Sequence, residues 1–344
     1  MLLEFDADQR LWQETVRDAV AKQCPPSLVR GVAEDGVDPA PLWQTYVEAG
    51  WTELTDPENA VELAVLLEEL GRATDPTPYL ATLTQFAPLA GDRFDPRQSG
   101  TAIYGGVTAR RDGEGWVLDG TAHHVLDGDR AQRLAVVTEA GVFVVDAGMA
   151  VARRSPVFDP VLHIAEVSFS GVHVPDSDRV QVADERSTSY SRAEKARHVA
   201  LAGMAITMVG ACQRILDLVL EHVKQRQQFG VAIGTFQAVQ HKAVDMHVAT
   251  ERARALSYFA ALTISADDPR RRLAAAMAKA AAGECQALVF RHGLQLFGAM
   301  GFTWENDLQF ALKRAKAGEL LLGGAAEHRA IIAEEYRGFD AADF

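Results

Sequence analysis

The chain has 344 residues and a formal net charge of −13, from 34 basic and 47 acidic residues. Its length predicts roughly two domains, and its composition, 48% hydrophobic and 24% charged, is typical of a folded globular protein. Because nucleic-acid binding proteins neutralise phosphates with excess positive charge, the acidic balance argues against a nucleic-acid partner.

The three cysteines, Cys24, Cys212 and Cys285, are far apart and show no C-x-x-C spacing. They therefore predict neither a disulfide framework nor a zinc site. Acidic residues near the N-terminus do not fit a signal peptide, and no apolar run is long enough to suggest a membrane span. We expect a protein of the reducing cytoplasm.

Three kinds of segment follow one another along the chain. Apolar residues at three- and four-residue spacings predict helices over 7–22, 41–50 and 59–74, the first capped by Asp6 or Asp8. Alternating apolar residues predict strands over 101–104, 115–118, 134–137, 142–146 and 165–170. Helical spacing returns over 192–225, 235–264, 270–297 and 325–335.

This order predicts an α+β fold of three domains. They are an N-terminal helical domain (1–99), a barrel-like β-domain (100–184) and a C-terminal four-helix bundle (185–344).

The stretch Arg226–Gly230, followed by Phe236 and Gln237, allows two interpretations. A basic helix end followed by a glycine is commonly only a C-cap. Together with Gln228 and Phe229, however, these residues also provide a guanidinium, amide donors and aromatic faces that could hold a pyrophosphate and its sugar. The residues alone favour neither interpretation.

A second stretch, Gln295–Phe302, places Gly298 and Gly301 at the end of a long helix, where they either form a plain turn or admit a close approach by another group. The adjacent His123 and His124 lack a third ligand at metal-site spacing, so no metal site is predicted.

Taken together, Arg226–Gly230, the Phe236-Gln237 pair and Gln295–Phe302 resemble the acyl-CoA dehydrogenase family, and the helical, β, helical order agrees with it. The resemblance implies a flavin enzyme that desaturates an acyl-CoA thioester between its α and β carbons. It also implies that one subunit's motifs contact the adenosine-diphosphate half of an FAD held mainly by a neighbouring subunit. The residues that keep this pattern here are Arg226, Gln228, Phe229, Phe236, Gln237, Gln295, Gly298 and Ala299.

At the positions that the resemblance implies for catalysis, this chain departs from the family pattern. Arg197 falls where the resemblance implies an arginine close to the substrate. The family's usual base, a glutamate, is replaced by Leu322, and the position used by a minority of members is Ala196. Neither side chain can accept a proton. Glu319 and Glu194 lie near these positions, but either would need a shifted loop or helix register to act as the base.

The residues expected beside the flavin ring also depart from the family pattern. The family's loop of the β-domain is replaced by the short stretch 102–108, and its Trp-Ile-Thr-Asn strand by 124–127, with His124 for the tryptophan and Leu126 for the threonine. The lost donor would remove both positioning and tuning of the flavin.

These departures lead to the hypothesis of a complementing subunit. Some bacterial acyl-CoA dehydrogenases that act on steroid side chains are α2β2 heterotetramers in which one subunit lacks the base, and this chain resembles those partners. Two alternatives stay open: a self-sufficient homo-oligomeric dehydrogenase that uses Glu319 or Glu194, and a flavin-free scaffold with the same fold.

Overall fold

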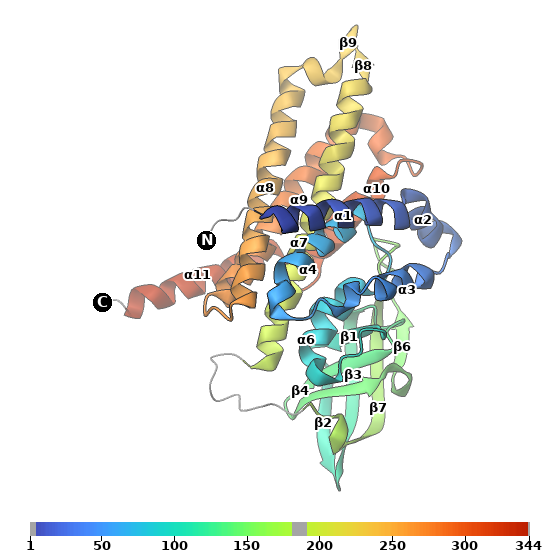
Figure 1. The fold of residues 1–344 in the computed structure, drawn as a ribbon, viewed down its shortest axis with the longest axis vertical. Helices are drawn as coiled ribbons and strands as arrows, with labels where there is room; N and C mark the ends of the chain where they lie inside the picture. The colour runs from blue at the N-terminus through green and yellow to red at the C-terminus, as the bar shows by residue number, and fades with distance from the viewer. Residues whose placement is uncertain (1–4, 181–190, 343–344) are drawn as a thin grey trace. The chain divides into compact units, whose positions relative to one another are not determined.

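The computed structural model of the protein describes residues 5–180 and 191–342, which form two compact units (Figure 1). The helical unit comprises Met1–Val37, Pro57–Asp75 and Leu201–Phe344, and the sheet unit comprises Asp38–Asp56 and Pro76–Ala200. The helices of the segments up to Val37 and over Pro57–Asp75 thus belong to one unit with the C-terminal helices, and the other N-terminal helices belong to the sheet unit. The three-domain limits remain a prediction, and the expected boundary at 184 lies outside the described residues.

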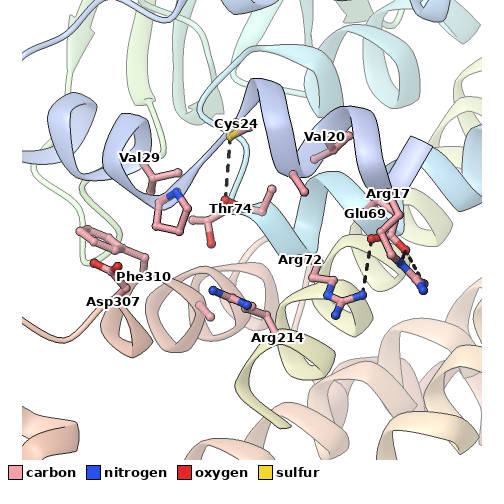
Figure 2. Close-up of a pocket in the computed structure, with 14 residues that line it drawn as sticks. Arg17, Val20, Cys24, Val29, Glu69, Arg72, Thr74, Arg214, Asp307 and Phe310 are labelled. Atoms are coloured by element: carbon pink, nitrogen blue, oxygen red, sulfur yellow. Dashed lines mark hydrogen bonds and ion pairs between the residues drawn. The ribbon is translucent and has the colours of Figure 1, made fainter. Parts of the chain in front are cut away.

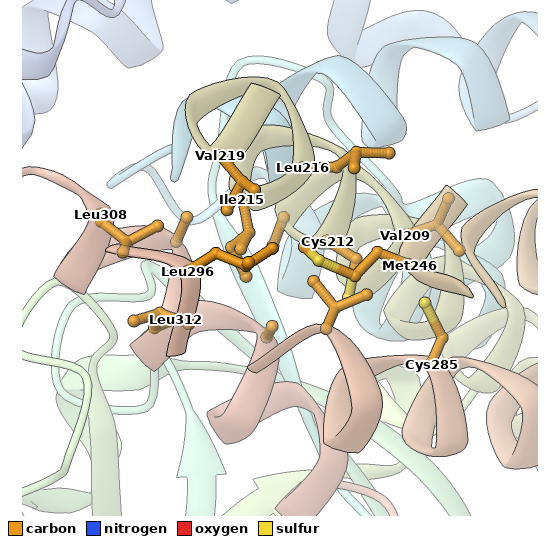
Figure 3. Close-up of a cluster of buried hydrophobic side chains, with 14 of the residues drawn as sticks. Val209, Cys212, Ile215, Leu216, Val219, Met246, Cys285, Leu296, Leu308 and Leu312 are labelled. Atoms are coloured by element: carbon orange, nitrogen blue, oxygen red, sulfur yellow. The ribbon is translucent and has the colours of Figure 1, made fainter. Parts of the chain in front are cut away.

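The helical unit is built from helices, most of them long. They are α1 (Ala7–Gln23), α2 (Pro26–Arg30), α4 (Ala60–Ala73), α7 (Arg192–Gln225, from Leu201 onward), α8 (Gln237–Ser265), α9 (Arg271–Phe297), α10 (Leu308–Leu320) and α11 (Ala325–Ala342). Asp6 caps α1 through a reciprocal capping box with Gln9. Ile215, Met246, Cys285 and Leu312 belong to a core that joins α7, α8, α9 and α10 (Figure 3).

The sheet unit contains two small sheets. Strands β1 (Gly100–Ile103), β4 (Arg133–Thr138) and β5 (Gly141–Asp146) form one, and β2 (Val107–Asp112), β3 (Gly115–Leu126), β7 (Ile164–Pro175) and β6 (Val151–Arg154) form the other, in these orders. Short helices α3 (Ala40–Glu48), α5 (Tyr79–Ala81) and α6 (Ala87–Ala90) also belong to the unit, as does the start of α7 up to Ala200. The two sheets share one apolar core that includes Leu134, Phe143 and Val167.

The predicted α+β fold class is confirmed, with helical parts on either side of a middle β region in the sequence. Each predicted helix and strand has a counterpart, and α7 has the predicted ends. The sequence prediction omitted the strands β2 and β6, the helix α10 and the short helices α2, α5 and α6. All four residues of β6 are exposed, and β2 is exposed over most of its length, so neither carries the apolar alternation that marks a half-buried strand.

Among the described residues, two helices are long and apolar enough to cross a membrane, α7 and the segment Arg271–Phe302, although the sequence suggested no such run. In their most apolar windows, 83% and 67% of the residues are buried inside the protein. Core helices of globular proteins have the same property, because they are covered by neighbours on most sides.

Candidate functional site

A small hairpin connects α7 to α8. Strands β8 (Gln227–Gln228) and β9 (Val231–Ala232) pair antiparallel, and the two residues between them, Phe229 and Gly230, have φ values of 54° and 80°. Positive φ at both loop residues is typical of a type I′ turn. The C-cap interpretation of Gly230 is therefore wrong, because α7 ends five residues earlier and the glycine serves a hairpin instead.

Phe229 is the unusual member of this turn. Positive φ disfavours residues with a side chain, and type I′ turns prefer Asn, Asp or Gly there. The Phe229 ring is 92% exposed, and the one aromatic contact described for it is an edge-to-face contact with Phe236 at 6.2 Å. A strained, exposed aromatic side chain suits contact with another molecule better than it suits stability.

Next to the hairpin lies a cavity of about 240 Å³. Five of the sequence-predicted residues line it, although about seventy positions separate the two motifs along the chain: Arg226, Gln228, Gln295, Gly298 and Ala299. The remaining lining residues are His222, Ile233, Leu296, Phe297 and Met300. The other three predicted residues do not line it: Phe229 and Phe236 form a ring pair, and Gln237 is the first residue of α8.

Local structure explains how the two motifs meet. The Ile233 backbone N–H donates to the Arg226 carbonyl at 2.8 Å, which ties the hairpin to the end of α7. On the other side, Gly298 has φ 63° and ends α9, so that the chain turns into the 3₁₀ segment Gly298–Phe302. Apart from the neighbours of Gly298 in the chain, no atom of the described residues lies within 4 Å of the position that a Cβ of Gly298 would take, so this backbone is open to an incoming group.

The polar groups of the cavity are free to bind a ligand. Within the described parts of the chain, the Arg226 guanidinium has no ion pair and the Gln295 side chain no hydrogen bond, and both are exposed. The Gln228 amide nitrogen donates to the Gln227 carbonyl at 2.9 Å, which leaves the amide oxygen available. One guanidinium and two amides are a donor set that fits a pyrophosphate and a sugar.

The sequence interpretation missed His222 and Phe297. Their rings stack with centroids 4.4 Å apart and an interplanar angle of 14°. Burial, and secondarily the nearby Arg226, lowers the pKa of His222, so the imidazole is neutral near pH 7 and adds no charge. The available signal was spacing, since His222 lies in the last turn of α7, four residues before Arg226, and the Arg226 backbone N–H donates to the His222 carbonyl at 2.8 Å.

Arg197 lies near the start of α7, within the sheet unit. Its exposed guanidinium lies over the Tyr104 ring, 5.9 Å from the centroid. The Tyr104 hydroxyl is buried and has no hydrogen-bond partner in the described residues. Burial raises the pKa of this phenol, which therefore stays protonated. Ala196 is 1% exposed and packs into the apolar cluster that includes Tyr104 and Phe86.

Both alternative carboxylates have structural contacts. The Glu194 side chain accepts a hydrogen bond from the Ser191 backbone N–H at 2.8 Å, while its own N–H donates to the Ser191 hydroxyl. This is a capping box at the start of α7. Glu319 forms an ion pair with Lys316 at 2.9 Å and also bonds the backbone of Ala325, where α11 begins. These contacts lower the pKa of Glu319, although burial opposes them.

Leu322 lies in the turn between α10 and α11 with φ 59°. The turn is held by buried groups: the Lys279 ammonium donates to the carbonyls of Glu319 and Gly323, at 3.2 and 2.6 Å, and the His328 ring contacts the Leu322 carbonyl at 3.0 Å. The backbone at this position is therefore well fixed, but its side chain is apolar.

In the sheet unit, the end of β3 offers few free groups. Leu126 is 4% exposed, and its carbonyl already accepts a hydrogen bond from Thr101 at 2.6 Å. The buried Asp127 carboxylate binds Arg130 at 2.7 Å. His124 lies in a bulge of β3 with φ 58° and is exposed. Among the described residues, no group of three His, Cys, Asp or Glu side chains could hold a metal ion.

Comparison with known proteins supports one family. The model of the acyl-CoA dehydrogenase C-terminal domain matches residues 192–336. Acyl-CoA dehydrogenase IpdE2 of Mycolicibacterium smegmatis is 30% identical over 96% of this chain and 99% of its own length, and its namesake in Mycobacterium tuberculosis is 30% identical over 93% and 94%.

Among solved structures, a chain of the ChsE4-ChsE5 complex from Mycobacterium tuberculosis superposes with a TM-score of 0.87 and 22% identity, covering 98% of this chain and 99% of that one. The fold agrees with the sequence evidence along nearly the whole length. With the two motifs brought together at one cavity, these matches show that the chain belongs to the acyl-CoA dehydrogenase family.

Proposed function

We propose that this chain is a subunit of an FAD-dependent acyl-CoA dehydrogenase that supplies the site for the adenosine-diphosphate half of FAD to a catalytic partner subunit. The observation that carries the proposal is the cavity in which Arg226 and Gln295, from distant motifs, present free polar groups. An arginine without a carboxylate partner in such a place favours an anionic ligand.

Each cavity residue has a role in this proposal. Arg226 would bind the pyrophosphate, Gln228 and Gln295 would bond to sugar or phosphate oxygens, and the open backbone at Gly298 and Ala299 would allow close approach. When bound, FAD supplies the hydride acceptor for desaturation of the acyl-CoA. This chain's own contribution is to hold and orient the cofactor.

The proton-accepting group would come from the partner. Leu322 and Ala196 cannot accept a proton, and Glu194 and Glu319 are held in a capping box and an ion pair. Freeing either carboxylate would require breaking these contacts and moving the chain segment that carries it. A two-protein assembly such as the ChsE4-ChsE5 complex is the arrangement we propose here.

The experiment is to purify this chain alone and in complex with a second acyl-CoA dehydrogenase subunit, and to measure FAD per chain and acyl-CoA-dependent dye reduction. We expect the isolated chain to contain little FAD and to show no activity. We expect the complex to contain FAD and to reduce the dye. A yellow, active preparation of the isolated chain would contradict the proposal and favour the self-sufficient enzyme.

A substitution tests the half-site itself. Arg226→Ala in the complex should weaken FAD binding by about ten- to a hundredfold, because a charge-assisted hydrogen bond contributes about 1.5 to 3 kcal/mol. Arg10→Ala, which removes an exposed arginine from α1, is the matched control. Unchanged FAD affinity in Arg226→Ala would favour the flavin-free scaffold.

A further inference from the structure

A second cavity, of about 330 Å³, lies within the helical unit among α1, α2, α4, α7 and α10 (Figure 2). It shares no lining residue with the Arg226 cavity. Most of its wall is apolar, formed by Val20, Ala21, Cys24, Pro26, Val29, Ala73, Phe310 and Ala311. Burial raises the pKa of the Cys24 thiol, which therefore behaves as a neutral part of this wall rather than as a nucleophile.

The charged groups of the wall are satisfied, with one exception. Arg17 binds Glu69 at 2.8 Å, Arg72 binds Asp217 at 2.6 Å, and Asp307 binds Arg30 at 2.7 Å. Arg214 is the exception, because over residues 5–180 and 191–342 it has no ion pair or side-chain hydrogen bond.

Arg214 is half-buried, and its guanidinium points from α7 into the middle of the pocket, below Thr74 (Figure 2). Thr74 ends α4 with φ 59°, a conformation that glycine usually supplies at a helix end. No described residue forms a hydrogen bond with its side-chain hydroxyl, which reaches the same space. A free cation and a free hydroxyl thus converge inside an apolar cavity.

We infer that this cavity binds a small monocarboxylate with an apolar body, its carboxylate on Arg214 and Thr74 and its body against Val29 and Phe310. A planar guanidinium matches a carboxylate in geometry and charge. Three arginines and two carboxylates line the cavity, so one negative charge balances it. At about 30 Å³ per water, the volume has room for roughly eleven non-hydrogen atoms, the size of a small aromatic acid.

This ligand class is independent of the FAD proposal, since it involves none of the residues of the half-site. Pockets that bind small molecules are typically apolar with a few convergent polar groups, as here. A dinucleotide or coenzyme A carries several phosphates and is too large and too highly charged for this volume and this single free cation.

The test is calorimetric titration of the full chain with cinnamate and, as the uncharged analogue, cinnamamide. We expect cinnamate to bind and cinnamamide to bind at least about tenfold more weakly. Arg214→Gln should reduce the cinnamate affinity by about ten- to a hundredfold. Arg10→Gln, the same change at an exposed position of α1, should leave it unchanged.

A second variant tests the cavity without changing the charge of the residues that line it. Ala21 lines the cavity and is itself exposed, so Ala21→Phe should fill the space, block cinnamate and leave the fold intact, as thermal melting would check. The inference is overturned if the wild type does not bind cinnamate, if cinnamamide binds equally well, or if the folded Arg214→Gln or Ala21→Phe variant binds cinnamate like the wild type.

Discussion

At the residue scale, Phe229 shows a conflict between stability and binding. Its φ of 54° places a bulky side chain in the left-handed region, and its ring is almost fully exposed. That conformation costs about 1 kcal/mol relative to an unstrained one. Because the ring is 92% exposed, burial against the described residues does not offset this cost. An intermolecular contact would explain why the position carries phenylalanine.

We therefore predict opposite effects of Phe229→Asn on stability and on flavin retention. Asparagine suits the first position of a type I′ turn, so the thermal midpoint should stay the same or rise slightly. FAD content of the complex should fall, because the ring is lost. Phe229→Tyr keeps the ring and should retain FAD. Full FAD retention in Phe229→Asn would show that the ring has no part in binding.

Lys279 permits a pH prediction at the same scale. Burial lowers the pKa of this lysine to about 8 from 10.5, so below pH 8 the folded protein holds a buried charge. Between about pH 8 and 10.5 the unfolded chain binds a proton that the folded chain has released. The lysine's contribution to the free energy of unfolding should therefore rise across this window, by about 1 to 3 kcal/mol.

The measurement compares the wild type with Lys279→Met by denaturant unfolding at about pH 7 and about pH 9.5. The stability difference in favour of the wild type should grow at the higher pH. Lys22→Met, on the exposed side of α1, should give the same difference at both values. A difference between wild type and Lys279→Met that does not change with pH would contradict the prediction.

Residue types were the most predictable part of the site. Arg226, Gln228, Gln295, Gly298 and Ala299 were predicted from the resemblance of their two motifs to the family, and they line one cavity. The contribution of His222 depends on stacking against Phe297, which is 75 positions away along the chain. Such a contact arises only from tertiary packing, and it cannot be predicted from the types of the two residues.

At the element scale, α4 and α7 cross very closely. A Cβ added to Gly210 on α7 would lie 1.9 Å from the Glu68 carbonyl oxygen, and one added to Gly71 on α4 would lie 2.2 Å from the Thr207 carbonyl oxygen. The crossing depends on these two glycines. Any larger residue would collide with the backbone of the other helix, which cannot move aside as a flexible side chain can. Sequence patterns could not single out these glycines within long helical segments, because only the packed structure shows which backbone lies opposite each of them.

We predict that Gly210→Ala destabilises the helical unit by about 3 kcal/mol, although alanine favours helix formation. Gly31→Ala in the same unit is the control, because Gly31 has helical φ and ψ and its Cβ would meet the Val37 side chain at 3.0 Å, which is 42% exposed and can move. That change should cost no more than about 1 kcal/mol. Equal urea midpoints for the two variants would contradict the prediction, because they would show that α4 and α7 can move apart without loss of stability.

Elements were predictable where their own periodicity was strong. The long helices combine apolar spacing with helix-forming residues, and α7 has the predicted ends. Strands β2 and β6 are edge strands, held by pairing to β3 and β7 rather than by their own apolar residues. Pairing with a distant strand leaves no local pattern in the sequence, which is why both were omitted.

At the scale of the whole molecule, apolar surface gathers in the C-terminal half of the sequence. Val244 and Val248 are 57% and 60% exposed and lie four residues apart on α8, hence on one face. Large exposed side chains also occur at Phe302 and Trp304. Apolar residues exposed together are typical of surfaces that another chain covers, in keeping with a cofactor shared between subunits.

We predict that replacing Val244 and Val248 by glutamate disrupts association of this chain with itself or with its partner. Light scattering after gel filtration should show a lower mass, while the thermal midpoint of the isolated chain changes little, because neither side chain packs in its core. Leu11→Glu with Val151→Glu adds the same charge at similarly exposed positions and should leave the mass unchanged. Since the half-site would act only when a second subunit brings the rest of the flavin site, the double variant should also lose FAD. An unchanged mass would place the subunit interface elsewhere and separate these valines from flavin binding.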